Sequence, residues 1–341
     1  MKDYVNWAVL APGRIANSMA KAMSETSKKD QTVRLYAVAS RSYVRADNFA
    51  KQWGFSKSYG DYESLYNDPK VDAVYVANPH SLHYKTVMNL LKNGKHVLCE
   101  KPAGCNVEQL IEMMKFANSN DLFFMEAMWS AFNPTLHKIR EYIDSGKLGS
   151  LLNIDSKFCL RTEFDKESRL WNPSLAGGAL LDLGIYNVFF AMFMNHFKGV
   201  EFFSSDVRMR NNVDAWNNVS IKFSNKVTTT FQSSIDVPSV SKTHDAVIYC
   251  SKGYIIVRNF FMAQEAEIYL YDSDKGNECK LAETISVPFE INGYEYEFRE
   301  ATKQILAGNV TSDIYTFTDS IYLSTVLTDI RQQWNFKYPF E

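Results

Sequence analysis

The sequence predicts a two-domain α/β protein, with a parallel sheet and helices in its N-terminal part and an α+β domain of mostly antiparallel strands after it. The chain has 341 residues, of which 46% are hydrophobic, so it can bury two sizeable cores. Strand-like and helical segments alternate up to about residue 126, whereas strand patterns dominate later. We therefore expect one domain over residues 1–126 and a second over residues 127–341.

The N-terminal part alternates short apolar strands with amphipathic helices. Strands are predicted at residues 5–10, 33–40, 73–77, 96–99 and 122–125. Helices are predicted after Gly13, at residues 43–53 and 81–93, and from Val107, where Asn106 and Gln109 have capping-box spacing. This order predicts βαβ units and a parallel sheet, at whose carboxyl edge ligands bind.

The C-terminal part changes from this alternation to successive strands. After a helix at residues 134–145, strands are predicted at residues 152–158, 218–223, 227–235, 246–250 and 254–258. Lys252-Gly253 is a hairpin signal between the last two. Helices near residues 294–307 and 313–334 complete an α+β domain of antiparallel strands.

Composition argues against several kinds of partner. The 37 basic and 39 acidic residues give a net charge of -2, which supplies no basic surface for a nucleic acid. No apolar leader and no run of about 18 apolar residues is found, so no membrane segment is expected. The cysteines at 99, 105, 159, 250 and 279 lack metal spacing, which favours reduced thiols in the cytoplasm and no metal. Cys99 is expected to be a buried packing residue, with a reactive role left open.

A short turn between the first strand and the first helix has the pattern of a dinucleotide-binding loop. Residues 11–16, APGRIA, form a degenerate G-x-G-x-x-G/A with alanine at the first position. Gly13 would let the backbone approach a pyrophosphate, and Ala16 is small enough for close helix–strand packing. A plain structural turn is the alternative, but the position favours a Rossmann nucleotide site. Cofactor contacts are expected at Ala11, Gly13, Arg14 and Ile15.

The end of the second strand carries no acidic residue of the kind that binds the ribose of NAD. Ser40 and Arg41 stand there, and Arg45 follows one helical turn later. A guanidinium group suits a ribose 2′-phosphate. The sequence therefore favours NADP over NAD, with solvated surface arginines as the alternative.

Two further segments carry side chains suited to catalysis. Glu100-Lys101-Pro102 follows a buried strand, where Lys101 would lie at the ligand-binding edge; a surface ion pair with Glu100 is the alternative. Pro102 also permits a cis peptide bond. Gly177-Gly178 precedes a helical pattern in which Asp182 and Tyr186 are four residues apart, on one face of an α-helix. Tyr186 would then serve as a general acid or base, although a capping aspartate and a core tyrosine are commoner.

Weaker candidates lie at a third strand end and among the aromatic residues. Asn78, His80 and His83 follow the strand at residues 73–77, where they would contact a ligand or cap and pack the next helix. Pocket-lining and core positions are both open for Trp129, Phe132 and Trp171.

Three features in order and spacing resemble the glucose-fructose oxidoreductase and inositol dehydrogenase family over essentially the whole chain. They are the degenerate glycine turn, Glu100-Lys101-Pro102, and Gly177-Gly178 leading to Asp182. Residues 125–129 and 178–186 look most like the dimeric dihydrodiol dehydrogenase and NADP-dependent D-xylose dehydrogenase branch. The resemblance implies a Rossmann domain and a second domain whose large, mostly antiparallel sheet often forms the subunit interface, so a homodimer or homotetramer is expected.

The resemblance also implies residue roles. Tyr186 would be the acid/base, Lys101 would lie by the nicotinamide and favour ionisation of the tyrosine, and Asp182 would orient the substrate. The expected cofactor contacts are Ala11, Gly13, Arg14, Ile15, Ser40, Arg41, Arg45, Asn78, His83, Glu100 and Lys101. The expected substrate contacts are Trp129, Phe132, Trp171, Asp182 and Tyr186.

The implied activity is hydride transfer between NADP and a carbinol or carbonyl carbon of a small polyhydroxy substrate. Ala131 and Asn133 stand where the animal dihydrodiol dehydrogenases have an arginine and an aromatic residue, so an aldose is expected before a trans-dihydrodiol. A non-catalytic NADP-binding regulatory or sensor protein of the same fold is the alternative. A sugar oxidoreductase that retains its cofactor between turnovers is a third interpretation.

Overall fold

The computed structural model describes residues 3–238, 244–271 and 278–341, which form two compact units. Unit 1 consists of the chain up to Phe132 together with Glu290–Ser324, and unit 2 consists of Asn133–Phe289 and Thr325–Glu341. This division differs from the expected boundary after residue 126, because residues 290–324 return to unit 1. There, Trp7 in the first strand donates a hydrogen bond to Thr302 at 3.1 Å and packs on Phe298 with ring centroids 5.1 Å apart.

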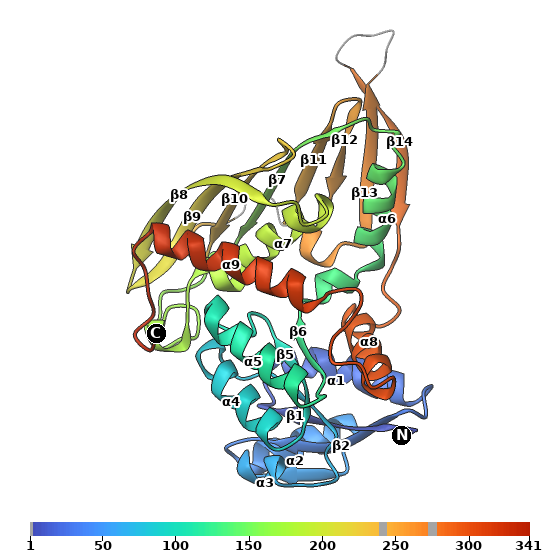
Figure 1. Ribbon diagram of the computed structural model, residues 1–341, viewed down its shortest axis with the longest axis vertical. Helices are drawn as coiled ribbons and strands as arrows, with labels where there is room; N and C mark the ends of the chain where they lie inside the picture. Colours follow the sequence, from blue (N-terminus) through green and yellow to red (C-terminus); the bar gives the residue numbers. More distant parts are fainter. Residues whose placement is uncertain (1–2, 239–243, 272–277) are drawn as a thin grey trace. The chain divides into compact units, whose positions relative to one another are not determined.

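Unit 1 contains a parallel six-stranded sheet in the order β3-β2-β1-β4-β5-β6. Figure 1 labels β1, β2, β5 and β6 of this sheet. The strands are β1 (Val5–Leu10), β2 (Val33–Ala39), β3 (Lys57–Tyr59), β4 (Ala73–Val76), β5 (His96–Glu100) and β6 (Phe124–Ala127). The helices are α1 (Arg14–Ser27), α2 (Tyr43–Trp53), α3 (Glu63–Tyr66), α4 (His80–Lys92), α5 (Val107–Ser119) and α8 (Tyr294–Leu306). The strand order reverses between β1 and β4, which is the switch point where doubly wound sheets bind ligands. The predicted Rossmann domain is confirmed.

The start of α5 has the predicted cap. The Asn106 side chain accepts a hydrogen bond from the Gln109 backbone N–H at 3.0 Å, and the Gln109 side chain accepts one from the Cys105 N–H at 3.0 Å. These bonds satisfy donors that a helix start otherwise leaves unpaired. They fix the chain that leaves β5 through the Glu100-Lys101-Pro102 turn.

Unit 2 contains an eight-stranded sheet in the order β14-β13-β12-β11-β7-β10-β9-β8. The strands are β7 (Leu151–Cys159), β8 (Val200–Arg210), β9 (Val213–Phe223), β10 (Thr228–Ser234), β11 (Ala246–Cys250), β12 (Gly253–Val257), β13 (Glu265–Tyr271) and β14 (Cys279–Ser286). Neighbouring strands are antiparallel except β7 and β10, which are parallel. The large, mostly antiparallel sheet is therefore confirmed. The sequence analysis did not predict β8, β13 and β14.

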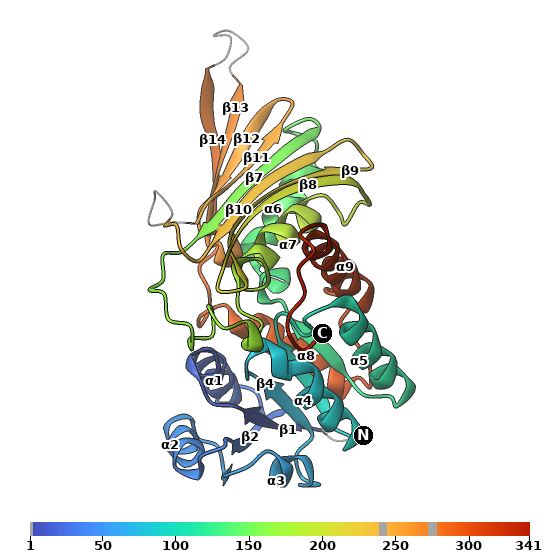
Figure 2. The ribbon, with the colours of Figure 1, turned by 90° about the vertical axis from the view of Figure 1, so that its left-hand side faces the viewer.

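Helices of unit 2 cover one face of this sheet. The α6 helix (Pro134–Asp144) contacts β13 and β14, and α7 (Ile185–Met194) contacts β7 and β10 (Figure 2). Every residue of α7 is buried. Within the described residues, one helical stretch, residues 173–194, is long and apolar enough to cross a bilayer. Polar residues interrupt this stretch, so the sequence has no unbroken apolar run of that length. Because 89% of its most apolar window is buried, it fits the core helix of a globular domain.

Candidate active site

The turn after β1 has the geometry of a dinucleotide loop. Ala11 takes a left-handed conformation with φ of +66°, which glycine adopts without a steric penalty, so alanine at this first position carries some strain. The Ala11 N–H donates to Ala39 at 3.0 Å and ties the turn to the end of β2. Gly13 then occupies the N-cap position of α1.

This turn leaves room for an anionic group. A Cβ atom added to Gly13 would meet only the Ala11 carbonyl oxygen, at 3.9 Å, so the protein itself leaves open the space over the turn. No described side chain caps α1, and its first turn has no acidic residue. Unpaired N–H groups at a helix start favour a phosphate, so the turn fits the pyrophosphate of a dinucleotide.

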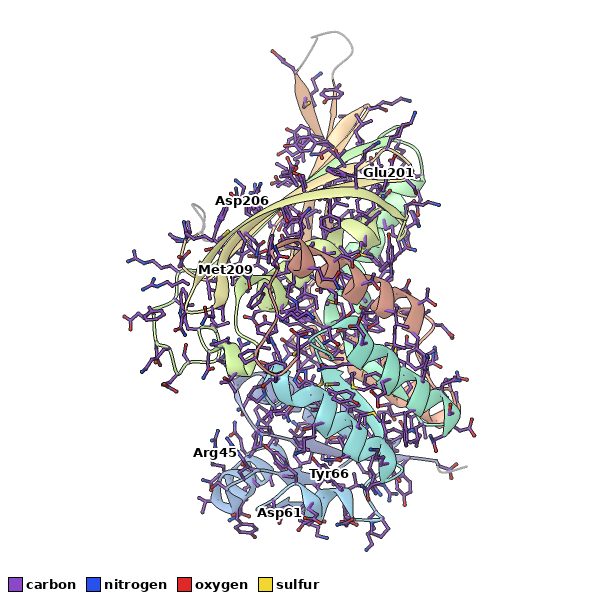
Figure 3. All side chains as sticks on the ribbon, turned by 60° about the vertical axis from the view of Figure 1, so that its left-hand side comes forward. Arg45, Asp61, Tyr66, Glu201, Asp206 and Met209 are labelled. Atoms are coloured by element: carbon purple, nitrogen blue, oxygen red, sulfur yellow. The ribbon has the colours of Figure 1, made fainter. Side chains whose placement is uncertain are left out.

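The end of β2 carries the side chains expected to select the cofactor. Ser40 is buried and its hydroxyl accepts a hydrogen bond from the Ser42 N–H at 3.3 Å, whereas Arg41 and Arg45 are exposed. Figure 3 labels Arg45 on α2. Burial raises the pKa of Tyr62, and both arginines oppose this shift, so both guanidinium groups lie near the Tyr62 hydroxyl. Neither arginine forms a salt bridge within the described residues, which leaves two cations to pair with a phosphate.

The end of β4 is held by a buried histidine. The His83 ring lies between two carbonyl oxygens, with Nε2 at 2.7 Å from that of Asn78 and Nδ1 at 2.7 Å from that of Pro102. His83 is fully buried, so it braces two ligand-facing turns, and its direct cofactor contact stays a prediction. The Asn78 amide donates to Thr86 at 2.8 Å, while its oxygen has no partner within the described residues. That oxygen is a free acceptor beside the switch point.

The turn after β5 holds Lys101 in a buried setting. Glu100 accepts a hydrogen bond from the Tyr75 hydroxyl and another from the Lys101 backbone N–H at 3.2 Å. The Lys101-Pro102 peptide bond is cis, as the sequence permits. Glu100 and Lys101 are both buried, so the alternative of a solvated surface ion pair is wrong.

A second buried carboxylate, which the sequence analysis did not single out, lies close to Lys101. Glu126 on β6 accepts hydrogen bonds from the Ala103 N–H at 2.9 Å, the Tyr315 hydroxyl at 2.9 Å and Ser320 at 2.7 Å. Burial raises the pKa of Glu126, and these bonds and the Lys101 cation partly offset the shift. Glu126 therefore ties the returning segment 290–324 to the turn that carries Lys101.

In unit 2, the paired glycines allow close backbone approach. A Cβ atom on Gly177 would lie 2.5 Å from the Leu170 carbonyl oxygen, and one on Gly178 would lie 2.1 Å from a carboxylate oxygen of Asp214. Gly178 also has φ of +122°, which side chains rarely permit. Glycine is thus required at both positions to place the helix that follows.

That helix differs from the predicted regular α-helix. Leu180–Gly184 forms a π-helical turn, and α7 begins at Ile185. Asp182 lies in the π-turn and Tyr186 in α7. Because a π-turn has i→i+5 hydrogen bonds, the prediction that both residues share one face of a regular α-helix does not hold. The Asp182 carboxylate pairs with both terminal nitrogens of Arg169, at 2.8 Å and 3.2 Å. This bidentate pair fixes the carboxylate. Arg169 was not among the residues predicted from the sequence.

Tyr186 is held by aromatic neighbours. Its ring centroid lies 5.8 Å from that of Phe158 on β7 and 5.4 Å from that of Phe261. His244 lies against Phe158 at 4.3 Å, and burial lowers the pKa of His244, which favours a neutral imidazole. The tyrosine ring is thus fixed by packing, as a proton-transfer group should be.

The three aromatic candidates have packed positions. In unit 1, Trp129 is buried and stacks on Tyr294 with centroids 4.3 Å apart, and Phe132 is also buried. In unit 2, Trp171 has no exposed surface and donates to Thr162 at 3.0 Å, so it supports the segment after β7, and its substrate contact stays a prediction. Cys99 is fully buried, and burial raises its pKa well above the ordinary value, so it is a packing residue.

A doubly wound parallel sheet with an open phosphate turn at its switch point defines a dinucleotide-binding fold. Residues 5–128 match the oxidoreductase family with an NAD-binding Rossmann fold, and residues 136–256 match the GFO/IDH/MocA C-terminal domain. The chain belongs to the GFO/IDH/MocA oxidoreductase family.

Curated relatives cover nearly the full length of the chain. Trans-1,2-dihydrobenzene-1,2-diol dehydrogenase of Xenopus laevis is 31% identical over 338 residues, which are 98% of this chain and 99% of the relative. The Homo sapiens enzyme of the same name is 30% identical over 345 residues, with 98% of each chain covered. The family resemblance found in the sequence is therefore confirmed.

Solved structures show the same fold. A 3-ketoreductase from Actinomadura kijaniata, in complex with TDP-benzene and NADP, superimposes with a TM-score of 0.85 at 21% identity and covers 96% of this chain and 97% of its own. Levoglucosan dehydrogenase, in complex with NADH and L-sorbose, has a TM-score of 0.84 at 17% identity, with 97% and 96% covered. One neighbour thus holds NADP and the other NADH.

Proposed function

We propose that the protein is an NADP-dependent dehydrogenase that acts on a CH–OH carbon of a small polyhydroxy substrate, with Tyr186 as acid/base. The observation that carries the proposal is the helix start in unit 2, where an aspartate fixed by arginine and a tyrosine fixed by aromatic rings are held in place by paired glycines. When bound, the nicotinamide accepts or supplies the hydride. Tyr186 takes or returns the hydroxyl proton, Asp182 orients the substrate, and Lys101 supplies a cation at the carboxyl edge of the Rossmann sheet.

The substrate class in the proposal is an aldose, with a trans-dihydrodiol as the second candidate. The names of the curated relatives favour the dihydrodiol. Asn133, one of the two departures from those enzymes, caps α6 by accepting from the Thr135 N–H at 2.8 Å and donates to Ala263 at 2.9 Å. Ala131 is fully buried. These positions serve the fold here, so the chain lacks the arginine of the animal enzymes at position 131, which favours the aldose.

A cofactor-reduction screen tests this proposal. Aldoses, polyols and trans-dihydrobenzenediol are each supplied with NADP or NAD, and formation of the reduced cofactor is followed by absorbance. Turnover of an aldose with NADP supports the proposal. Tight NADP binding without turnover of any compound would favour the regulatory alternative, and NADP that survives purification would favour a cofactor-retaining oxidoreductase.

Cofactor choice is expected to depend on the two arginines near Tyr62. Arg41→Ala should raise the KM for NADP by about 10- to 100-fold, because a charge-assisted phosphate contact is lost. The KM for NAD should change little. Arg34→Ala is the control, since Arg34 lies at the start of the same strand over the Tyr4 ring. Equal KM changes for NADP and NAD would overturn the assignment.

We also propose that the protein forms a homodimer or homotetramer through the sheet of unit 2. On the face opposite the buried residues, Tyr249, Tyr254 and Tyr269 are paired across β11, β12 and β13, and Tyr249 is exposed. A row of aromatic side chains on an open sheet face suits a protein interface. Light scattering should show an oligomer that Tyr249→Glu weakens, and a monomeric native protein would contradict this. Within the described residues the cysteines form no disulfide, which fits the proposed cytoplasmic location.

A further inference from the structure

A buried carboxylate lies directly behind the start of the helix that carries Asp182 and Tyr186. It belongs to Asp214 on β9, whose side chain is fully buried. One oxygen, Oδ2, accepts hydrogen bonds from the Leu180 backbone N–H at 2.7 Å and from the Asn217 amide at 2.9 Å. The other oxygen, Oδ1, has no partner within the described residues. Asp214 is thus attached through Leu180 to the first residue of the π-turn.

The chain around this contact is shaped to admit the carboxylate. The absent side chain of Gly178 makes room for Oδ1, since a Cβ there would overlap it. The Gly178 N–H donates to Leu170 at 2.9 Å, and the Tyr338 hydroxyl donates to the Gly177 carbonyl at 2.8 Å. The helix start is therefore held from the segment before it, from the C-terminal segment and from β9. Of these contacts, the one to β9 involves a carboxylate.

The pKa of the Asp214 carboxyl group lies close to neutral pH. Burial raises its pKa to about 7, although the Leu180 and Asn217 hydrogen bonds and the Arg331 cation on α9 (Phe317–Gln333) act in the opposite direction. Arg331 is itself paired with Glu341 at 2.6 Å. The neighbouring strand β8 presents Met209, which does not titrate. Asp214 thus changes charge in the physiological range.

We propose that Asp214 is a positioning residue that sets the start of the helix carrying Asp182 and Tyr186, and that its protonation makes turnover pH-dependent. The inference rests on the proposed roles of those two residues. Ionised Asp214 forms charge-assisted bonds and lies at a helix N-terminus, where negative charge is stabilising. Protonation places a hydrogen on the carboxyl group, weakens the bond from Leu180, and loosens the helix start.

Ionisation of Asp214 lowers the stability of the folded protein at the pH values at which it supports turnover. The pKa of Asp214 is about 7 in the folded protein and about 3.9 in the unfolded chain. The contribution of this group to the free energy of unfolding is therefore fully present below about pH 4 and is lost as pH rises to about 7. Asp214→Asn keeps a hydrogen-bond acceptor but cannot ionise. It should therefore raise Tm relative to the native protein above neutral pH, and the difference should shrink toward pH 4.

The experiment compares the pH dependence of kcat between about pH 5 and pH 9 for the native enzyme, Asp214→Asn and Asp214→Ala. Native kcat should fall on the acid side of about pH 7. Asp214→Asn, which is uncharged like the protonated carboxyl group, should lose this acid inflection and keep a kcat near that of the native acid limb at every pH, whereas Asp214→Ala should lower kcat by about 10- to 100-fold with the KM for NADP unchanged. Asp206→Asn, on the exposed edge strand β8 and labelled in Figure 3, is the matched control and should behave as the native enzyme.

Hydrogen exchange at the Leu180 amide separates this inference from the proposed function. Asp214→Ala should abolish protection of that amide at alkaline pH, and Asp206→Asn should not. An acid inflection retained in Asp214→Asn, or native kcat and native protection in Asp214→Ala, would overturn the positioning role. Loss of protection in Asp214→Ala combined with full activity of Tyr186→Phe would instead overturn the proposed function.

Discussion

Tyr186→Phe is expected to lower kcat by about 10²- to 10⁴-fold, because the hydroxyl that exchanges a proton with the substrate is lost. Phenylalanine keeps the ring contacts with Phe158 and Phe261, so the fold of unit 2 should be preserved. The cofactor site expected in unit 1 does not include this side chain. Steady-state kinetics should therefore show the loss in kcat, while NADP affinity measured by fluorescence titration stays nearly unchanged.

Tyr249→Phe is the matched control for the loss of a tyrosine hydroxyl. Tyr249 lies on the sheet face that we propose as the subunit interface, where phenylalanine keeps the aromatic ring, so Tyr249→Phe should give native kcat. An equal loss of kcat in both variants would indicate a general effect of the substitution. Native kcat in Tyr186→Phe would remove this residue from proton transfer, and the site would then need another acid, such as a water held by Asp182.

Much of unit 1 could be predicted from local patterns. The βαβ alternation, the capping residues Asn106 and Gln109, and the turn that contains Gly13 each depend on residues close in sequence. The Glu100-Lys101-Pro102 turn was placed correctly at a strand end for the same reason. The edge strands β8 and β14 were missed because many of their side chains are exposed, which weakens the apolar alternation that identifies a strand.

The contacts that shape the candidate site depend on residues far apart in sequence. Asp214 lies 34 positions from Leu180, whose N–H it binds, and no local pattern marks that pair. Arg169 and the π-turn were also unpredicted, because helical spacing assumes regular α-helix geometry. The paired glycines stand out in the sequence, but their cause does not: Gly177 lies against the Leu170 carbonyl oxygen and Gly178 against the Asp214 carboxylate.

Substitution of two glutamates on α8 is expected to change the free energy of unfolding. Glu295 and Glu297 are both fully buried. Glu295 accepts hydrogen bonds from the backbone N–H groups of Ile291, Asn292 and Gly293, at 2.8, 3.0 and 2.7 Å. In contrast, neither carboxyl oxygen of Glu297 has a hydrogen-bond partner within the described residues. Burial, followed by the nearby Glu100, raises the pKa of Glu297 well above the ordinary value, which favours the neutral acid.

Glu297→Met is expected to increase the free energy of unfolding by about 1–3 kcal/mol at neutral pH, because it removes an unsatisfied buried polar group at similar volume. Glu295→Gln should decrease it by a similar amount, since three backbone donors lose a charged acceptor. A raised folded pKa contributes stability below the unfolded value of about 4.3 that is lost as pH rises, so the advantage of Glu297→Met should grow toward alkaline pH.

Denaturant unfolding of the native protein and both variants, repeated across a pH series, measures these differences. Glu297→Gln separates charge from shape: it cannot ionise, so it should be at least as stable as the native protein at alkaline pH. If Glu297→Gln instead lost stability as Glu295→Gln does, Glu297 would be an ionised group with a partner of its own. The carboxyl group beside Glu100 would then support the Lys101 turn through its charge, and the buried neutral acid inferred from its surroundings would be wrong.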